Sequence, residues 1–415
     1  MQIGFVSTRL AGTDGVSLEA RKWADMLSSL DHQCFCFAGE VDWPPERSYV
    51  VSEAHFNHPE VRALSESLFG HSVRSSETSQ AVQALKGHLT SHLYRFVDAF
   101  APDLLIVENA LAIPMNVPLG LALTEFIAET EMPTIGHHHD FSWERARFWP
   151  NAASDYLCSA FPPTLPSVRH VVINSIAAEQ LAFRIGVGSM LIPNVMDFES
   201  PPADSDDYAA DLRSTLGIAR DEWLILQPTR IVPRKGIERA IELVARLDSA
   251  ATLVISHASG DEGTAYEAYL QNYAKVMGVR VLFAADMFDH RRRETPDGRK
   301  VYDLGDVYQV ADLVTYPSNQ EGFGNAFLEA VYHRRPVVVN RYEVFRTDIQ
   351  PKGFEVIAFD GFATEETVRQ VEALLQDPAR GAEVVEHNYE VGQRYYSYRT
   401  LERGLRGLLD TGWKL

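Results

Sequence analysis

Positively charged residues gather at one turn in the second half of the chain, in the segment Arg230–Gly236 (Arg-Ile-Val-Pro-Arg-Lys-Gly). The segment follows an apolar run that ends at Gln227, and its proline and glycine predict a tight turn before a helix. Arginine grips a phosphate with two N–H groups, lysine adds a point charge, and a helix N-terminus offers free N–H groups. The segment is therefore a candidate diphosphate site with two or three cations; the alternative is a solvated basic loop.

Two carboxylates flank a glycine-rich stretch further along, in Glu321-Gly-Phe-Gly-Asn-Ala-Phe-Leu-Glu329. The stretch follows an apolar run with strand character, and we expect a helix to begin near Asn325. Glu321 then lies in a loop and Glu329 lies in the first part of the helix. Two carboxylates placed in this way could hold sugar hydroxyls at two positions. The alternative is that Glu321 caps the helix and Glu329 is an exposed helix charge.

Three consecutive histidines, His137–His139, precede Asp140 at the end of an expected strand. Because side chains alternate along a strand, His137 and His139 face one way and His138 faces the other. At most two of these histidines could then share a metal ion. A structural role, in which the histidines hydrogen-bond neighbouring strand ends, is a second interpretation, and a third follows from the resemblance described next.

The two charged segments, in this order, resemble the C-terminal domain of the family 4 retaining glycosyltransferases. Ile192–Asp197 is similar to the family's Pro-Asn-Gly-Val-Asp segment, with Val195 in place of the glycine. The segment 388–409 resembles the family's terminal helices. The resemblance implies the GT-B fold, with two Rossmann-like domains facing a cleft and a last helix that crosses back to the N-terminal domain.

The resemblance also implies roles for the charged segments. Arg230 and Lys235 would hold the diphosphate of a nucleotide sugar, and Glu321 would contact the sugar ring. Glu329 would bind the ribose hydroxyls of the nucleotide. The backbone around the helix start would support the sugar or the diphosphate through Asn325, Ala326 and Phe327.

In the N-terminal half, the resemblance makes His139 the histidine of a His-Asp pair that lies against the donor sugar, with His138 as the alternative if the match is shifted by one residue. Gly12 and Gly15 match the family's glycine-containing first loop, which approaches the diphosphate. An acceptor pocket is a further expectation, although an ordinary structural role is the alternative for each of its candidate residues. These candidates are Glu19, Trp143 and Arg145.

Short β-rich apolar runs alternate with helical patterns along the chain, which is typical of βαβ units around parallel sheets. A proline- and aspartate-rich stretch at 199–207 indicates a linker. We therefore expect an α/β protein with two doubly wound domains, at 1–198 and 199–388. The resemblance implies that the first binds the acceptor and the second the nucleotide sugar. Terminal helices at 389–415 would pack back on the first domain. Expected strands are Gln2–Ser7, Leu104–Val107, Thr134–His137, Val171–Asn174, Leu224–Gln227, Thr252–Ser256, Val279–Ala284, Leu313–Tyr316 and Val337–Asn340.

The charge balance restricts the partners. The chain has 38 Lys and Arg against 57 Asp and Glu, a net charge of −19, which disfavours nucleic acid and electrostatic attachment to a membrane. Three cysteines without zinc-ligand spacing fit a reducing compartment, and no signal peptide is evident, so we expect a cytoplasmic protein. The oligomeric state is left open.

The reaction implied by the resemblance is the transfer of a glucosyl or mannosyl group from a nucleotide sugar, with retention of the anomeric configuration. The acceptor would be a small molecule such as a sugar, a sugar phosphate or glycerate. We expect no cofactor and no metal, the nucleotide sugar being a co-substrate. The alternatives are a GT-B sugar phosphorylase, a nucleotide-sugar epimerase, a non-catalytic binding subunit, and a transferase acting on a membrane or cell-wall glycan precursor.

Overall fold

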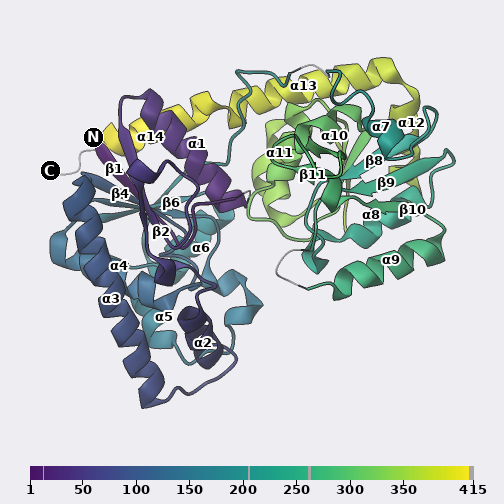
Figure 1. Ribbon diagram of the computed structural model, residues 1–415. Coiled ribbons are helices and arrows are strands. Elements are labelled where there is room, and N and C mark those ends of the chain that lie inside the picture. The colour runs from purple at the N-terminus through teal and green to yellow at the C-terminus, as the bar shows by residue number, and fades with distance from the viewer. Residues whose placement is uncertain (13, 204–205, 260–262, 411–415) are drawn as a thin grey trace. The chain divides into compact units, whose positions relative to one another are not determined.

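The computed structural model describes residues 1–12, 14–203, 206–259 and 263–410. The chain forms two compact units, one made of Met1–Asn194 with the chain from Leu401 onward, the other of Val195–Thr400. Each unit has its own parallel sheet (Figure 1). The predicted α/β class with two doubly wound domains is therefore confirmed, while the predicted limits at 198 and 388 stay predictions.

The first unit is built on a seven-stranded sheet with the order β3-β2-β1-β4-β5-β6-β7, and every pairing in it is parallel. The order reverses between β1 and β4, which makes this the point where ligands bind in such sheets. Its strands are β1 (Gln2–Val6), β2 (Gln33–Ala38), β3 (Ser48–Val50), β4 (Leu104–Glu108), β5 (Thr134–His138), β6 (Val168–Val172) and β7 (Ser189–Leu191).

Helices cover this sheet through apolar faces. One large buried cluster joins helices α2 to α5 to strand side chains such as Phe37 and Leu105, and a smaller one holds Leu181 of α6 against Phe141. The helices that precede the C-terminal segment are α1 (Gly15–Ser29), α2 (Pro59–Leu68), α3 (Ser76–Phe100), α4 (Val117–Thr130), α5 (Ser154–Ala160) and α6 (Ser175–Ile185).

Strand β6 differs from its predicted position. We expected it at Val171–Asn174, but it runs from Val168 to Val172. Asn174 instead caps α6, because its side chain accepts a hydrogen bond from the backbone N–H of Ala177 at 2.7 Å. The apolar pattern continued into this cap, which is why the sequence placed the strand too late.

The second unit is built on a six-stranded parallel sheet with the order β10-β9-β8-β14-β15-β16, which reverses between β8 and β14. Its strands are β8 (Trp223–Gln227), β9 (Ala251–Ile255), β10 (Arg280–Phe283), β14 (Leu313–Tyr316), β15 (Val337–Asn340) and β16 (Ile357–Phe359). Its helices are α7 (Leu212–Thr215), α8 (Ile237–Val244), α9 (Ala265–Met277), α10 (Leu304–Val310), α11 (Asn325–Tyr332), α12 (Glu365–Gln376) and α13 (Pro378–Tyr396), with a π-helical turn at Phe345–Ile349.

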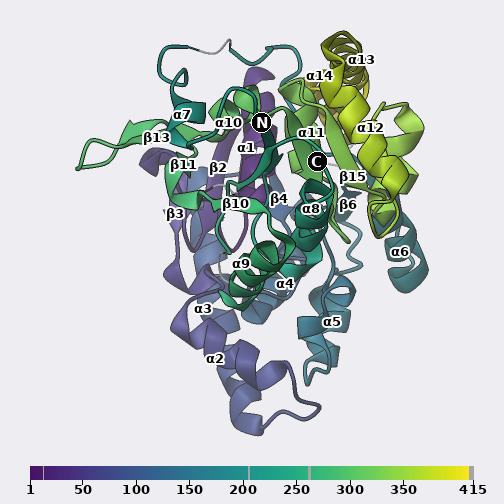
Figure 2. The same ribbon diagram turned by 90° about the vertical axis from the view of Figure 1, so that its right-hand side faces the viewer.

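A small sheet adds to the second unit between β10 and α10. It has the order β11-β13-β12, formed by Phe288–Asp289, Lys300–Asp303 and Arg293–Glu294, and Figure 2 shows its hairpin projecting from the unit. Arg292 beside the hairpin pairs with Asp206 and Asp306. This arginine therefore serves as a structural tie within the unit.

The last described helices belong to different units. In α13, Tyr389 donates a hydrogen bond to the carbonyl of Phe198 at 3.0 Å, within the second unit. Helix α14 (Tyr398–Asp410) belongs to the first unit from Leu401 onward, and Arg169 donates to its Leu408 carbonyl at 3.0 Å. The predicted return of the terminal helix to the first domain is thus confirmed. Among the described residues, each helix is too short or too polar to cross a lipid bilayer.

Candidate functional site

The charged segments of the second unit lie where its strand order reverses. The loop that carries Arg230 and Lys235 follows β8, and the loop that carries Glu321 follows the neighbouring strand β14. Buried Gln227 at the end of β8 accepts a hydrogen bond from Thr315 of β14 at 2.7 Å. The two loops therefore leave the sheet side by side at its carboxyl edge.

A short 3-10 turn, Pro233–Lys235, turns the lysine inward. Gly236 ends the turn with a φ of 59°, and a Cβ on it would lie 2.6 Å from the carbonyl oxygen of Pro317. Only glycine suits this position, because it needs both a left-handed conformation and close contact with the neighbouring loop. The backbone N–H of Asn319 donates to the Arg234 carbonyl at 2.8 Å and joins the two loops.

Lys235 and Glu321 form an ion pair at the centre of these loops. The lysine Nζ lies 2.5 Å from Glu321 Oε1, and Arg234 lies 3.3 Å from Oε2. Burial lowers the pKa of Lys235, and Glu321 opposes that shift. Burial alone would raise the pKa of Glu321, but Lys235 and Arg234 bring it below its ordinary value. The lysine Nζ also lies over the ring of Tyr316, 5.7 Å from its centroid.

Arg230 differs from Lys235 because its side chain is exposed. Both cations act on His257, which follows the adjacent strand β9: burial, then Lys235 and Arg230, lower the pKa of this histidine to about 4. The backbone N–H of Ile231 donates to the Ala258 carbonyl at 3.2 Å. The structure thus brings the two predicted cations to one local environment beside His257.

The predicted helix start is confirmed, since α11 begins at Asn325. Asn325 and Ala326 are half-buried, whereas the Phe327 side chain is fully buried in the core. Glu329 accepts a hydrogen bond from the hydroxyl of buried Tyr308 at 2.9 Å. The interpretation of Glu329 as a freely exposed helix charge is therefore wrong.

In the first unit, the three histidines face as predicted. His137 Nδ1 lies 2.9 Å from Glu108 Oε2 and His139 Nε2 lies 3.0 Å from the same atom, whereas His138 bonds to His170 at 2.9 Å. Burial alone would raise the pKa of Glu108, but the two histidines lower it to about 2. Burial lowers the pKa of His137 and, with His170, that of His138. Burial would also lower the pKa of His139, but Glu108 raises it above its ordinary value.

The backbone next to His139 is held by Asn109. This residue has a φ of 61°, and its side-chain oxygen accepts the N–H of His139 at 3.0 Å. Its amide donates to Asp140 at 2.7 Å, and Asp140 also pairs with Arg145. The candidate acceptor residue Arg145 therefore has an ion-pair partner beside the histidines.

Of the other acceptor candidates, Glu19 is buried and Trp143 is half-buried. Glu19 on α1 is 1% exposed and pairs with Lys22 at 2.6 Å. Trp143 donates to Gln180 of α6 at 2.6 Å and stacks on Phe141, with centroids 4.4 Å apart. These contacts are structural, and an acceptor role for either residue stays a prediction.

The first loop carries Gly12 and Gly15 at the carboxyl end of β1. The Gly12 N–H donates to Asp42 at 3.1 Å, and Gly15 is the first residue of α1. Asp14 caps the helix and accepts hydrogen bonds from two backbone N–H groups of its first turn. A carboxylate thus already uses part of this helix N-terminus, and the diphosphate role of the loop stays a prediction.

Glu108, His137 and His139 also form a possible ligand set for a metal, because their ligand atoms lie within 4.8 Å of one another. Two imidazoles and a carboxylate suit several divalent ions. The sequence analysis considered only the histidines and did not find Glu108. The signal was present, since a carboxylate directly follows the buried run Leu104–Val107 on the strand next to the histidines.

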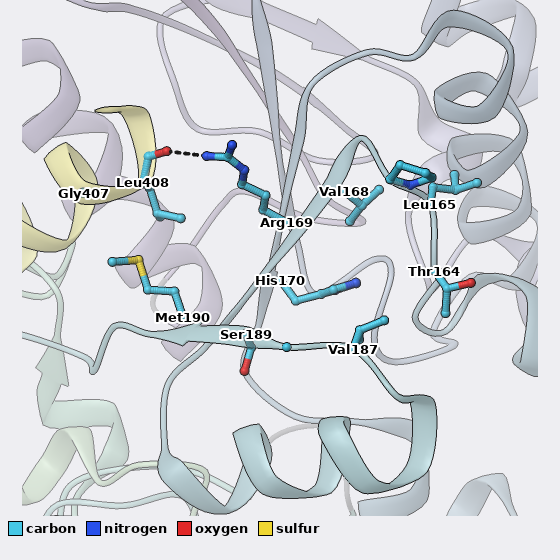
Figure 3. A pocket seen from close by; sticks show the side chains of 12 residues that line it. Thr164, Leu165, Val168, Arg169, His170, Val187, Ser189, Met190, Gly407 and Leu408 are labelled. Atoms are coloured by element: carbon cyan, nitrogen blue, oxygen red, sulfur yellow. Dashed lines mark hydrogen bonds between the residues drawn. The ribbon is translucent and has the colours of Figure 1, made fainter. Parts of the chain in front are cut away.

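A separate pocket of about 500 Å³ lies at the opposite edge of the same sheet (Figure 3). It is lined by the residues that lead into β6 and β7, including Thr164 and Val187, and by Gly407 and Leu408 of α14. Ligands of doubly wound sheets bind at the carboxyl ends of strands. This pocket at the amino ends is therefore not the candidate active site.

Comparisons with known proteins agree with this arrangement. A family model described as glycosyl transferases group 1 matches residues 224–377. Mannosylglucosylglycerate synthase of Petrotoga mobilis is 32% identical over 99% of this chain and 97% of its own length; that of Thermotoga maritima is 32% identical over 97% and 98%. The crystal structure of Anabaena HepE in complex with UDP and glucose covers 99% of this chain and 100% of its own, at 16% identity and a TM-score of 0.66.

Two doubly wound parallel sheets with charged loops at their carboxyl edges, together with this structural likeness, define the GT-B fold. The relatives found by sequence identify the family and the class of enzyme. The chain belongs to the group 1 glycosyltransferase family and is a hexosyltransferase. The predicted family is therefore confirmed.

Proposed function

We propose that this enzyme transfers a mannosyl group from a nucleoside diphosphate sugar to a hydroxyl of glucosylglycerate or a closely related small glycoside. One observation carries the proposal. The similarity to two proteins named mannosylglucosylglycerate synthase spans nearly the whole of all three chains. It therefore includes the first unit, which the sequence predicts to bind the acceptor, as well as the matched segment 224–377.

The donor part of the proposal rests on the charged loops of the second unit. In the transfer, the bond from the anomeric carbon to the phosphate oxygen breaks, and a bond to the acceptor oxygen forms. The departing diphosphate gains negative charge, which Arg230 and Lys235 would stabilise. Glu321 would contact the sugar and Glu329 the ribose, while His139 would act on the sugar from the first unit. The relative HepE, solved with UDP and glucose, supports a nucleotide-sugar donor.

We further propose that transfer retains the anomeric configuration and needs no metal. Attack would occur on the face that the diphosphate leaves, and the leaving phosphate oxygen would accept the proton of the acceptor hydroxyl. Lys235 and Arg230 would then supply the charge that a divalent ion supplies in metal-dependent transferases. A cytoplasmic location is part of the same proposal, supported by three cysteines that form no disulfide.

The test is product analysis with a matrix of donors and acceptors. GDP-mannose, UDP-mannose, GDP-glucose and UDP-glucose are each incubated with glucosylglycerate, with its 3-phosphate and with glycerate, in EDTA and in Mg²⁺. We expect nucleoside diphosphate release and an α-mannoside, seen by NMR, only with a mannosyl donor and an unphosphorylated glycoside. Release without a glycoside product, or transfer only to the phosphorylated acceptor, contradicts the acceptor assignment. An absolute need for Mg²⁺ contradicts the metal-free mechanism.

A further inference from the structure

We infer that Arg234 is a positioning residue: its guanidinium holds the Glu321 carboxylate by Oε2 in the position from which Glu321 contacts the donor sugar. The inference deepens the proposed function and rests on it for the role of Glu321. The resemblance of the sequence gives roles to Arg230 and Lys235 but none to Arg234, which lies between them in the chain.

Arg234 contacts three successive residues of the loop that follows β14. Its carbonyl oxygen accepts the backbone N–H of Asn319 at 2.8 Å. Its Nη1 lies 3.4 Å from the carbonyl oxygen of Gln320 and 3.3 Å from Glu321 Oε2. The main chain and the side chain of one arginine therefore hold the loop at the point where the carboxylate leaves it.

The two oxygens of Glu321 are divided between two cations. Lys235 Nζ lies 2.5 Å from Oε1, and Arg234 contacts Oε2. The Glu321 side chain is 9% exposed and that of Arg234 is 26% exposed, so water and salt screen this contact less than a surface ion pair. A lysine is a point charge that leaves the carboxylate free to turn about it. The second contact, from Arg234, is the one that fixes the orientation of the carboxylate.

Lys235 has a second task in the proposed function, which is to stabilise the diphosphate. A diphosphate carries more negative charge than one carboxylate, so the lysine Nζ turns toward it when the donor binds. A largely buried carboxylate still needs a positive partner in that state. Arg234 is the cation that stays with Glu321, because its contacts with Asn319 and Gln320 tie it to the same loop.

Arg239 of α8 provides a matched control, because it holds the same loop by other contacts. Its Nη1 donates to the carbonyl oxygen of Pro317 at 3.2 Å and also bonds to the side-chain oxygen of Asn319. Neither contact involves Glu321. The effect of Arg239→Gln therefore measures the general attachment of the loop, and the additional effect of Arg234→Gln measures the hold on the carboxylate.

The first experiment separates the sugar from the nucleotide. The affinity for GDP and UDP is measured by calorimetry, and kcat/KM is measured with the nucleotide sugar that the enzyme uses. We expect Arg234→Gln to keep the wild-type affinity for the nucleoside diphosphate. We expect its kcat/KM to fall by about 10- to 100-fold, because a misplacement of about 1 Å in a reacting site can cost about 100-fold. Arg239→Gln should keep most of its kcat/KM.

Three results of this experiment overturn the inference. The first is an unchanged kcat/KM in Arg234→Gln. The second is an equal loss of affinity for the nucleoside diphosphate, because Arg234 would then bind the diphosphate directly. The third is an equal loss of kcat/KM in Arg239→Gln, because attachment of the loop alone would then explain both variants.

A double-mutant cycle tests the contact itself. We expect Arg234→Gln to lower both kcat/KM and the urea midpoint of the wild-type protein. Its effect should be much smaller in a chain that already carries Glu321→Gln, because the carboxylate that Arg234 holds is then absent. Additive effects in either measurement overturn the inference.

The two proposals can fail separately. Urea unfolding needs no substrate, so coupled unfolding in a protein that is inactive with every nucleotide sugar contradicts the proposed function alone. If Glu321→Gln does not fold, the comparison of the single variants Arg234→Gln and Arg239→Gln decides the inference.

Discussion

Arg230 and Lys235 are both predicted to bind the diphosphate, but they differ in exposure. Replacing each in turn therefore distinguishes an effect on catalysis from an effect on stability. Arg230 is exposed and Lys235 is buried against Glu321. We expect Arg230→Ala to lose about 2–4 kcal/mol of transition-state stabilisation, comparable to the loss of one oxyanion donor, with no change in Tm. The measurement is kcat/KM with thermal unfolding, and Arg220→Ala, an exposed cation outside these loops, is the control.

Lys235→Ala should instead affect both quantities. The catalytic loss should be similar, and among the residues that the structure describes Glu321 would keep Arg234, at 3.3 Å, as its one cation partner. Removal of one partner from a buried pair costs about 3–5 kcal/mol in the free energy of unfolding. Urea denaturation measures this cost. Wild-type kcat/KM in both Lys235→Ala and Arg230→Ala would remove the diphosphate assignment.

Glu329 is predicted to bind the ribose, and its hydrogen bond from Tyr308 provides a matched control. We expect Glu329→Ala to weaken nucleoside diphosphate binding, measured by calorimetry, more than it lowers kcat. Tyr308→Phe removes the same 2.9 Å bond but keeps the carboxylate, so it should bind the nucleotide nearly as well as the wild-type protein. Equal losses in the two variants would show that the carboxylate has only a structural role.

At the scale of elements, the start of α11 depends on Gly324. This glycine has a φ of 134°, and a Cβ on it would lie 2.3 Å from the hydroxyl of Tyr342. We expect Gly324→Ala to lower the free energy of unfolding by about 1–3 kcal/mol through backbone strain, and to disturb nucleotide binding by moving the helix start. Gly353→Ala is the control, because Gly353 has a φ of 94° but open space around it. This variant therefore measures the backbone strain without a clash with a neighbouring side chain. Equal nucleotide affinity in both variants would contradict the packing argument.

The sequence predicted the elements whose formation depends on residues that are close together in the chain. The β8 strand before the basic turn and the helix start at Asn325 follow from apolar runs, prolines and glycines that act over a few residues. The segment 44–85 is not assigned from the sequence, because many of its residues are polar and its strand β3 is short and at most half-buried. The buried residues of α2, which are Val61, Leu64 and Leu68, do recur at helical spacing.

The side-chain partners in the site depend on tertiary structure, which a single sequence does not reveal. Glu108 meets His139 only because β4 pairs with β5 in a register that sets Glu108 against His137. From the sequence, Trp143 is an aromatic residue in a loop, yet its indole N–H donates a hydrogen bond to Gln180 on a later helix. The positions of residues in backbone turns were therefore predictable, whereas side-chain partners that depend on strand register were not identified from the sequence.

At the scale of the whole molecule, the first unit depends on the end of the chain. Leu405 of α14 is 1% exposed, in a helix that packs on this unit. We expect Leu405→Ala to cost about 2–5 kcal/mol in the free energy of unfolding through the cavity it leaves. Arg403→Ala on the exposed side of the same helix is the control. Equal unfolding curves for the two variants would show that α14 contributes no burial to the first unit.

The division of the first unit between both ends of the chain also constrains synthesis. Its sheet is complete once the ribosome has passed Asn194, but the helix that covers Ile192 and Arg169 is translated only after the whole second unit. The nascent first unit must therefore wait, with apolar surface uncovered, until the second unit and α14 have been translated. A gene fragment that stops at the first boundary would encode a sheet without its final cover, so the two halves of this enzyme cannot be separated by a single cut.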